Sequence, residues 1–199
     1  MGAQGVTDDR DRGAKPTGAE DEAQLMARIR ARDLRAFEIL YRNYHPRLTR
    51  FLTNLIRRPQ LVEEVLNDTM LVVWNKPESY NGGSRLSTWI FAIGYRKALK
   101  ALRRYDDPQE DAQAERRASG EPGPEHDLGR REAQAALLEA MRQLSPDHRA
   151  VVDLTYFHEI GYREIAEIMD CPVDTVKTRM YYARRHLKRV LAGALTDWL

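Results

Sequence analysis

The stretch GYREIAEIMDCPVDTVKTRMYYARRHL, residues 161–187, contains a short apolar-edged segment, a tight turn and a long basic segment. Apolar side chains recur at helical spacing in residues 162–169, and the sequence DCP that follows them marks a turn. A short helix, a tight turn and a longer helix form the helix-turn-helix arrangement, and the small Ala166 suits a close crossing of its two helices. We therefore predict a helix-turn-helix near the C-terminal end of the chain.

The longer helix of this arrangement divides by face. One apolar stripe is expected to pack on the preceding helices, and it consists of Val176, Met180, Ala183, Leu187 and Val190. The opposite face is basic and has no matching acids. A solvated face is one interpretation; we favour DNA recognition, because recognition helices insert their N-terminal half into the major groove and place later cations on phosphates. The base-edge candidates are Lys177, Thr178, Tyr181 and Tyr182, and the phosphate candidates are Arg184, Arg185 and Lys188.

A second basic helix is predicted after a glycine-containing loop. One face of residues 87–105 carries a tryptophan and a row of cations, namely Trp89, Arg96, Lys100 and Arg103. Single-stranded nucleic acid requires aromatic faces for its bases and cations along its backbone. On this helix alone, Trp89 as a core anchor beside a solvated row is an equally good interpretation. The loop favours a nucleic-acid site, because Asn81, Gly82, Gly83, Ser84 and Arg85 offer backbone freedom and polar groups for a flipped base.

The chain of 199 residues, 42% of them hydrophobic and 31% charged, has room for one or two small domains. Helical spacing recurs throughout without a convincing strand pattern, so we predict an all-α fold. Residues 106–130 are polar with proline and glycine punctuation, and they cannot bury enough apolar surface to offset the entropy of ordering. The expected organisation is a disordered leader at 1–22, a helical domain at 23–105, a flexible linker at 106–130 and a second helical domain at 131–199.

Several classes of function are disfavoured by composition. The net charge is only +2, so any nucleic-acid surface must come from local clustering of cations. The five histidines lack partners at metal-ligand spacing, and we find no nucleophile triad and no phosphate-binding glycine loop, so we predict no enzyme, cofactor or metal. The single Cys171 is expected to be a packing residue. No apolar run approaches the ~18 residues of a membrane span, so we expect a cytoplasmic protein without membrane insertion.

Three segments together resemble the extracytoplasmic-function group of bacterial RNA polymerase sigma factors. EEVLNDTMLVVW, residues 63–74, is similar to that family's polymerase-binding helix, and YNGGSRLSTWIFAI, residues 80–93, to its promoter-melting loop and helix. Residues 161–187 are similar to its C-terminal helix-turn-helix. Order and spacing agree from about residue 23 to 191 outside the linker, in a chain of 199 residues.

The resemblance implies specific partners and roles. Core polymerase would be bound at its β′ clamp helices by Glu64, Asn67 and Asp68. The melted strand of the minus-ten element would be held by Asn81, Gly82, Ser84, Arg85, Thr88, Trp89, Arg96 and Lys100. The duplex minus-thirty-five element would be read by the recognition helix. Members are commonly held inactive by an anti-sigma factor, which is a further expected partner.

At four positions the chain departs from the family's usual residues. Asn67 and Asp68 stand where Gln and Glu are usual, which implies a looser docking contact because each side chain is one methylene shorter. Arg96 replaces a frequent Asn, and Tyr182 replaces a common Arg, which implies an altered base preference.

Two other functions remain open from the residues. One is a stand-alone helix-turn-helix regulator that binds an operator as a dimer, with its first domain serving ligand sensing or self-association. The other is a protein-interaction module whose acidic helix binds a partner and whose basic faces are incidental. A regulator should protect its operator without polymerase, and a protein-interaction module should show no strongly salt-dependent DNA binding.

Overall fold

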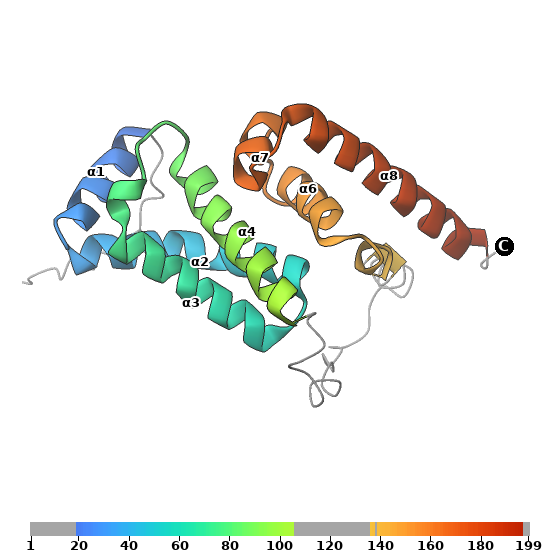
Figure 1. Ribbon diagram of the computed structural model, residues 1–199, viewed down its shortest axis with the longest axis horizontal. Coiled ribbons are helices and arrows are strands. Elements are labelled where there is room, and N and C mark those ends of the chain that lie inside the picture. Colours follow the sequence, from blue (N-terminus) through green and yellow to red (C-terminus); the bar gives the residue numbers. More distant parts are fainter. Residues whose placement is uncertain (1–18, 106–135, 138, 197–199) are drawn as a thin grey trace, which may run out of the picture.

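The computed structural model describes residues 19–105, 136–137 and 139–196. Helices follow one another in the order α1 Ala19–Arg30, α2 Leu34–Ile56, α3 Pro59–Asn75, the short 3-10 helix η1 Pro77–Ser79, α4 Leu86–Tyr105, α6 Pro146–Tyr156, α7 Tyr162–Met169 and α8 Val173–Thr196 (Figure 1). A short helical segment within residues 136–142 precedes α6. No strand occurs among these described residues, so the predicted all-α fold is confirmed.

The apolar spacing of residues 25–55 is that of one continuous helical block, but the structure divides it between α1 and α2. The break lies before Leu34, where Arg32 has a φ of 64° and Asp33 caps α2. The Asp33 carboxylate accepts hydrogen bonds from the backbone N–H groups of residues 35 and 36, at 2.9 and 3.3 Å. A hydrogen bond from Arg28 is the main cause of the lowered pKa of Asp33. An aspartate at this position satisfies N–H groups that a new helix leaves unpaired.

Residues 19–22 belong to α1, so the predicted leader is too long by these four positions. Glu22 shows why they are ordered. Its carboxylate accepts hydrogen bonds from the Tyr44 hydroxyl at 3.1 Å and from the backbone N–H of Leu86 at 3.3 Å, which ties α1 to α2 and α4. Residues 1–18, the predicted linker at 106–130 and residues 197–199 lie outside the described part of the chain.

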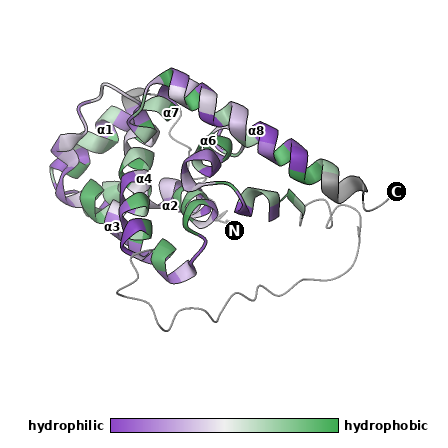
Figure 2. Ribbon diagram, turned by 45° about the vertical axis from the view of Figure 1, so that its right-hand side comes forward, coloured by the Kyte–Doolittle hydropathy of each residue, from purple (hydrophilic) through white to green (hydrophobic). Residues whose placement is uncertain are grey.

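Helices α2, α3 and α4 pack around a shared apolar core. Its largest fully buried side chains include Leu40, Leu48, Phe51, Leu52, Leu86, Ile90 and Phe91. Hydrophobic and hydrophilic residues alternate along the helices, as the packing of amphipathic helices requires (Figure 2). Gly94 lets α4 approach α2 closely, because a Cβ atom there would lie 2.9 Å from Cδ1 of Leu48.

The C-terminal helices α6, α7 and α8 form the predicted helix-turn-helix unit. Ser145 is the N-cap of α6, with Pro146 at the first helical position, where its missing N–H leaves no hydrogen bond unmade. The turn between α7 and α8 is closed by Asp170, which has a φ of 49°, and by a hydrogen bond from the Cys171 N–H to the carbonyl oxygen of Ala166 at 3.0 Å. Side chains of the predicted stripe on α8 are buried at Val176, Met180 and Ala183.

The two groups of helices also pack against each other: α6 lies on α2, and α7 lies on α4 (Figure 1). Sequence analysis did not predict this contact. In the part of the chain that the structure describes, no helix has the length and apolar character to cross a bilayer.

Replacement of Gly94 by a β-branched residue tests the close approach of α4 to α2. We expect Gly94→Val to lower the free energy of unfolding by about 1–3 kcal/mol, because the added carbons overpack the contact with Leu48. Thermal unfolding followed by circular dichroism measures the effect. Gly161→Ser is the control, since a Cβ atom at this N-cap of α7 meets no atom within 4 Å. Equal melting temperatures for the two variants would contradict the close approach.

Candidate DNA and polymerase interfaces

The recognition-helix candidates lie on the solvent face of α8. Lys177 and Thr178 are exposed, and Tyr181 and Tyr182 have exposed fractions of 61% and 52%. Contrary to the expectation of an unmatched basic face, Lys177 Nζ donates to an Asp174 carboxylate oxygen at 2.9 Å. The Thr178 hydroxyl donates to the Asp174 carbonyl oxygen at 2.8 Å. Asp174 thus positions two of the four candidates for contact with base edges.

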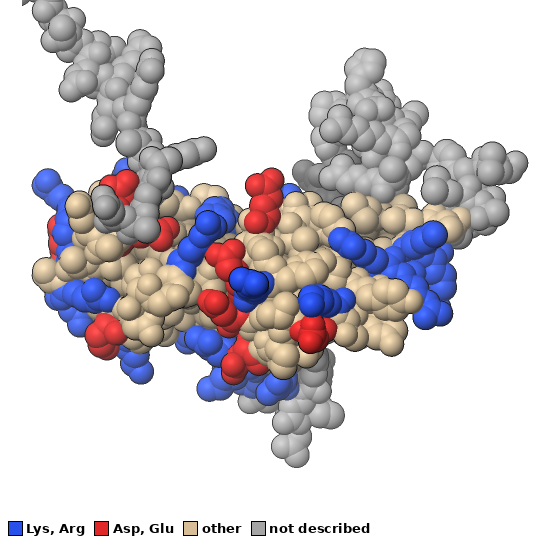
Figure 3. All heavy atoms as spheres, turned by 90° about the horizontal axis from the view of Figure 1, so that it is seen from above, with Lys and Arg blue, Asp and Glu red and all other residues tan. Residues whose placement is uncertain are grey.

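The cations that follow on α8 are the predicted phosphate contacts, and all three are exposed. Arg185 and Lys188 are exposed, and Arg184 is also held in place, since its Nε donates to the Tyr156 hydroxyl at 2.9 Å. Lysine and arginine side chains gather at the end of the molecule where α8 lies (Figure 3). A shallow groove on this face is lined by Tyr162, Lys177, Met180, Tyr181, Arg184, Arg185 and Lys188. From its N-terminal end, the exposed face of α8 therefore presents Lys177, Thr178 and the two tyrosines, followed by the three cations.

The loop before α4 is braced by local hydrogen bonds. An Asn81 side-chain oxygen accepts from the Gly83 N–H at 2.9 Å, and the Tyr80 hydroxyl donates to the Ser84 carbonyl oxygen at 2.9 Å. Gly82 has a φ of 76°, which side chains rarely adopt. Of the predicted loop residues, Asn81, Gly82 and Arg85 are exposed, while Ser84 is half-buried. Such bracing holds the loop in one shape before any ligand arrives.

Trp89 forms an aromatic pair at the base of this loop. Its half-buried ring lies 5.4 Å from the Tyr80 ring, centroid to centroid, so Trp89 is neither a fully buried anchor nor a free stacking platform. Sequence analysis did not identify Tyr80, although an aromatic residue directly before the glycine loop was the available signal. Arg96 and Lys100 are exposed farther along α4, as predicted.

Thr88 is placed differently from the other residues predicted to bind the melted strand. Only 2% of Thr88 is exposed, so it is not on the accessible surface in this arrangement. The reason is helix geometry. Residue 95 lies two turns along the same face of α4, and this face is the one that packs on the C-terminal helices.

The three predicted polymerase-docking residues are exposed on α3, but two of them are already ion-paired. Lys97 Nζ donates to Asp68 at 2.8 Å, and Arg104 donates to Glu64 at 2.9 Å. Partly exposed ion pairs of this kind contribute about 0–1 kcal/mol each to the stability of the fold. A binding partner with its own cations can therefore replace Lys97 and Arg104. Leu71, with an exposed fraction of 54%, lies one turn beyond Asn67 and Asp68 and adds an apolar group to this surface.

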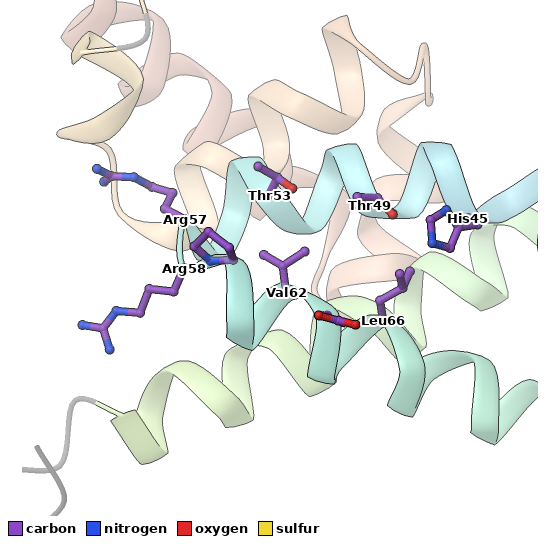
Figure 4. A pocket seen from close by; sticks show the side chains of 9 residues that line it. His45, Thr49, Thr53, Arg57, Arg58, Val62 and Leu66 are labelled. Carbon is purple, nitrogen blue, oxygen red and sulfur yellow. The ribbon is translucent and has the colours of Figure 1, made fainter. Parts of the chain in front are cut away.

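A hollow between α2 and α3 adjoins the same region and was not predicted. It is lined by His45, Thr49, Thr53, Arg57, Arg58, Pro59, Val62, Glu63 and Leu66. Figure 4 shows Val62 and Leu66 near its middle, with His45 at one end and the two arginines at the other. The Thr49 hydroxyl in its wall is buried and has no hydrogen-bond partner.

Nothing in the described residues forms a group of three or more side chains that could hold a metal ion. Burial raises the pKa of the Cys171 thiol, which reduces its thiolate fraction at neutral pH.

Comparisons with known proteins agree with this arrangement. The family description "Sigma-70 region 2" matches residues 40–107, and "Sigma-70, region 4" matches residues 134–187. RNA polymerase sigma-H factor of Pseudomonas aeruginosa is 27% identical over 188 residues, which cover 89% of this chain and 97% of the relative. The ECF RNA polymerase sigma-E factor of Haemophilus influenzae is 27% identical over 174 residues, covering 82% and 92%.

Two solved structures share the fold. The sigma factor RpoE of Bartonella quintana, in complex with the anti-sigma factor NepR, has a TM-score of 0.64 and 25% identity, over 78% of this chain and 96% of RpoE. CnrH, in complex with the cytosolic domain of CnrY, has a TM-score of 0.64 and 21% identity, over 85% of this chain and 96% of CnrH. On the two matched regions and these relatives, the chain belongs to the sigma-70 family, in its extracytoplasmic-function (ECF) group.

Proposed function

We propose that the chain directs core RNA polymerase to a specific set of promoters in the cytoplasm and performs no catalysis itself. The observation that supports this proposal is that one chain exposes two surfaces of different chemistry. The face of α8 suits a duplex, and the loop with the Tyr80–Trp89 pair suits an unstacked strand. The stand-alone regulator is not favoured, since it needs no second surface of this kind.

Region boundaries are part of the proposal. The N-terminal helices α1 to α4 would form the domain that binds core polymerase and the minus-ten element, and α6 to α8 would form the domain that reads the minus-thirty-five element. Residues 19–105 would then contain the first domain, and residues 136–137 and 139–196 would belong to the second. The two family matches, at 40–107 and 134–187, support this division.

The duplex would be read by the N-terminal half of α8. Lys177, Thr178, Tyr181 and Tyr182 would contact base edges, while Arg184, Arg185 and Lys188 would contact phosphates. The exposure of both tyrosines supports this assignment, because large exposed aromatic side chains are uncommon on a surface without a partner.

The melted strand would meet the loop and the outer face of α4. Asn81, Gly82, Ser84 and Arg85 would surround an extruded base, Trp89 would offer part of its ring for stacking, and Arg96 and Lys100 would follow the backbone. Thr88 would join them only after its face of α4 is uncovered.

Docking on core polymerase would use Glu64, Asn67 and Asp68 of α3, facing the β′ clamp helices. The ion pairs with Lys97 and Arg104 keep the two carboxylates oriented on the exposed side of α3. We also propose an anti-sigma factor as a regulatory partner. This rests on the likeness to RpoE, whose structure contains the anti-sigma factor NepR.

Removal of the Asp68 carboxylate should weaken the complex with core polymerase. We expect Asp68→Ala to raise the dissociation constant by about 10- to 100-fold, since a hydrogen bond to a charged group contributes about 1.5–3 kcal/mol. Fluorescence anisotropy of the labelled chain with purified core enzyme measures it. Lys97→Ala is the matched control, because it breaks the same internal ion pair and keeps the carboxylate. Equal losses for both variants would assign Asp68 a role within the fold only.

Selection of start sites tests the function as a whole. With core polymerase and a library of genomic fragments, the chain should initiate transcription at a defined set of promoters. Lys177→Ala should weaken binding to the preferred upstream element by about 1–3 kcal/mol per lost base contact, because Lys177 lies on the outward N-terminal face of α8. Lys188→Ala should instead weaken binding to all DNA sequences equally and reduce the salt dependence of that binding. An unaltered choice of start sites upon addition of the chain would refute the proposed function.

Truncation of Trp89 should affect strand opening more than initial promoter binding. We expect Trp89→Ala to reduce permanganate reactivity of melted thymines while closed-complex affinity stays within about twofold, because base stacking on an aromatic ring contributes about 1–3 kcal/mol per base. Trp89→Phe should restore most of the opening, as it keeps an aromatic face. Parallel losses in closed-complex formation and opening would contradict a role in the melted strand.

A further inference from the structure

Helix α8 carries a single carboxylate among its cations. Asp174 is the one acidic residue in the 24-residue sequence of α8, and it lies in the first turn. Successive residues of an α-helix are about 100° apart around its axis, which places Asp174 between Lys177 and Thr178 on the helix surface. Tyr181 and Arg185 follow along nearly the same line. The carboxylate therefore occupies the middle of the face that is proposed to read a duplex, at the N-terminal end of that face.

The fold itself makes little use of this carboxylate. The Asp174 side chain has an exposed fraction of 89%, and its ion-pair partner Lys177 has one of 60%. An exposed ion pair within one helix adds little to stability, because water screens both charges. A carboxylate in the first turn also interacts favourably with the helix dipole, but exposure weakens this effect as well. Stability of the fold is therefore a weak reason for a negative charge at this position.

A carboxylate on this face is unfavourable for DNA binding unless it meets a hydrogen-bond donor. The phosphates of a duplex repel it, and an ionised carboxylate accepts hydrogen bonds but donates none. In the major groove, the donors are the N4 amino group of cytosine and the N6 amino group of adenine. The N-terminal end of a recognition helix is the part that enters the major groove. Asp174 thus stands where base edges are its neighbours.

The ion pair of Lys177 and Asp174 matches the edge of one base pair. Lys177 Nζ lies 2.9 Å from Asp174 Oδ1, so a donor and an acceptor stand side by side. In a G·C pair, cytosine N4 donates to guanine O6, so these two atoms also lie about 2.9 Å apart at the major-groove edge. Lysine commonly contacts O6 and N7 of guanine, and aspartate commonly accepts from N4 of cytosine. The two side chains can therefore contact both bases of one pair without separating.

We infer that Asp174 is a specificity-determining residue that reads one G·C base pair together with Lys177. Lys177 donates to O6 and N7 of guanine, and Asp174 accepts from the outward N4–H of the paired cytosine. The inverted pair would set the carboxylate against guanine O6, which is also an acceptor, so the two side chains fix which strand carries the guanine. This inference rests on the proposed function, since it requires that α8 reads a duplex element.

Asp174 also changes what Lys177 contributes to affinity. A lysine without a carboxylate beside it is attracted to any phosphate, and that attraction carries no sequence information. The ion pair of Lys177 and Asp174 has no net charge, so its contribution depends on the base pair that it meets. Arg184, Arg185 and Lys188 lie farther along the same helix, whose sequence contains no further acid. The division between base reading and phosphate contact on α8 thus follows the position of Asp174.

The base preference of the complex with core polymerase tests this role. The full chain and purified core enzyme are bound, in competition, to promoter fragments that differ at one base pair of the upstream element. One G·C pair should be preferred about 5- to 140-fold over its replacements, the range for one specific set of base contacts. Asp174→Ala should lower this preference by about threefold or more and leave other positions unchanged, because Thr178 donates to the backbone carbonyl of residue 174. Lys177→Ala should relax the preference at the same base pair.

A modified base tests the contact without changing the protein. N4-methylcytosine still pairs with guanine, but its methyl group replaces the outward N4 hydrogen that the carboxylate would accept. At the cytosine of the preferred pair, it should weaken binding of the wild-type chain by about fivefold or more. It should change the affinity of Asp174→Ala by less than about twofold. A residue that only orients Lys177 would leave the wild-type chain insensitive to this methyl group.

Glu167→Ala is the matched control for charge. Glu167 is exposed on α7, the helix that precedes the turn into α8, so its substitution also removes one carboxylate near the DNA. It should change the affinity for all fragments by one common factor. A common factor of this kind in Asp174→Ala would overturn base reading by Asp174, and so would insensitivity of the wild-type chain to N4-methylcytosine at every cytosine of the element.

Failure of the inference and failure of the proposed function give different results. If the complex of the wild-type chain with core polymerase shows no preference at any position of the upstream element, the proposed function is refuted together with the inference. If it shows a preference that Asp174→Ala leaves unchanged at every position, the inference alone is refuted. Circular dichroism of Asp174→Ala should match that of the wild-type chain, since the substituted side chain is exposed.

Discussion

Burial of the apolar face of α2 is the interaction on which the rest of the structure depends. This helix contacts α1, α3, α4 and α6, and its buried residues are Ala36, Leu40, Tyr44, Leu48, Phe51, Leu52, Leu55 and Ile56. Each large side chain among them contributes about 1.5–3 kcal/mol on burial, which the ordering of the backbone largely offsets. Helix α2 thus fixes the positions of α3, α4 and α6. The polymerase-docking candidates lie on α3, the melted-strand candidates on α4 and the loop before it, and the duplex candidates on α8, which packs on α6.

Several charges on these interfaces form ion pairs with side chains at or near the surface. Lys177 is paired with Asp174, Lys97 with Asp68, and Arg85 with Glu164. Such pairs add little to stability, because water screens them and the side chains lose entropy in forming them. They do restrict where each charged group points. A phosphate or a partner side chain can therefore replace the internal partner at a small cost in free energy. The charged groups are already oriented when the ligand binds.

The parts of the fold that could be predicted from the sequence were those set by local spacing. The all-α class, the helix-turn-helix, the cap at Ser145 and the buried stripe on α8 all follow from residues within a few turns of one another. The break before Leu34 also had a local signal in Asp33, but the apolar spacing that continues across it outweighed this signal.

Long-range contacts account for most of what could not be predicted. Helical spacing places Tyr95 on the apolar face of α4, yet its hydroxyl donates to Asp147, 52 residues away. The burial of Thr88 has the same origin, because helical spacing shows that residues share a face and does not show what covers it. Which residues the partner surface contributes depends on packing between segments that are distant along the chain.

The contact between the two groups of helices buries polar groups as well as apolar ones. An apolar contact would need no such groups, yet this one includes Arg149, Asp153 and His158, with exposed fractions of 7%, 1% and 9%. Removing one partner from buried charges inside a fold leaves the other unpaired, which costs several kcal/mol. The paired polar groups therefore favour one packed geometry of the two groups of helices.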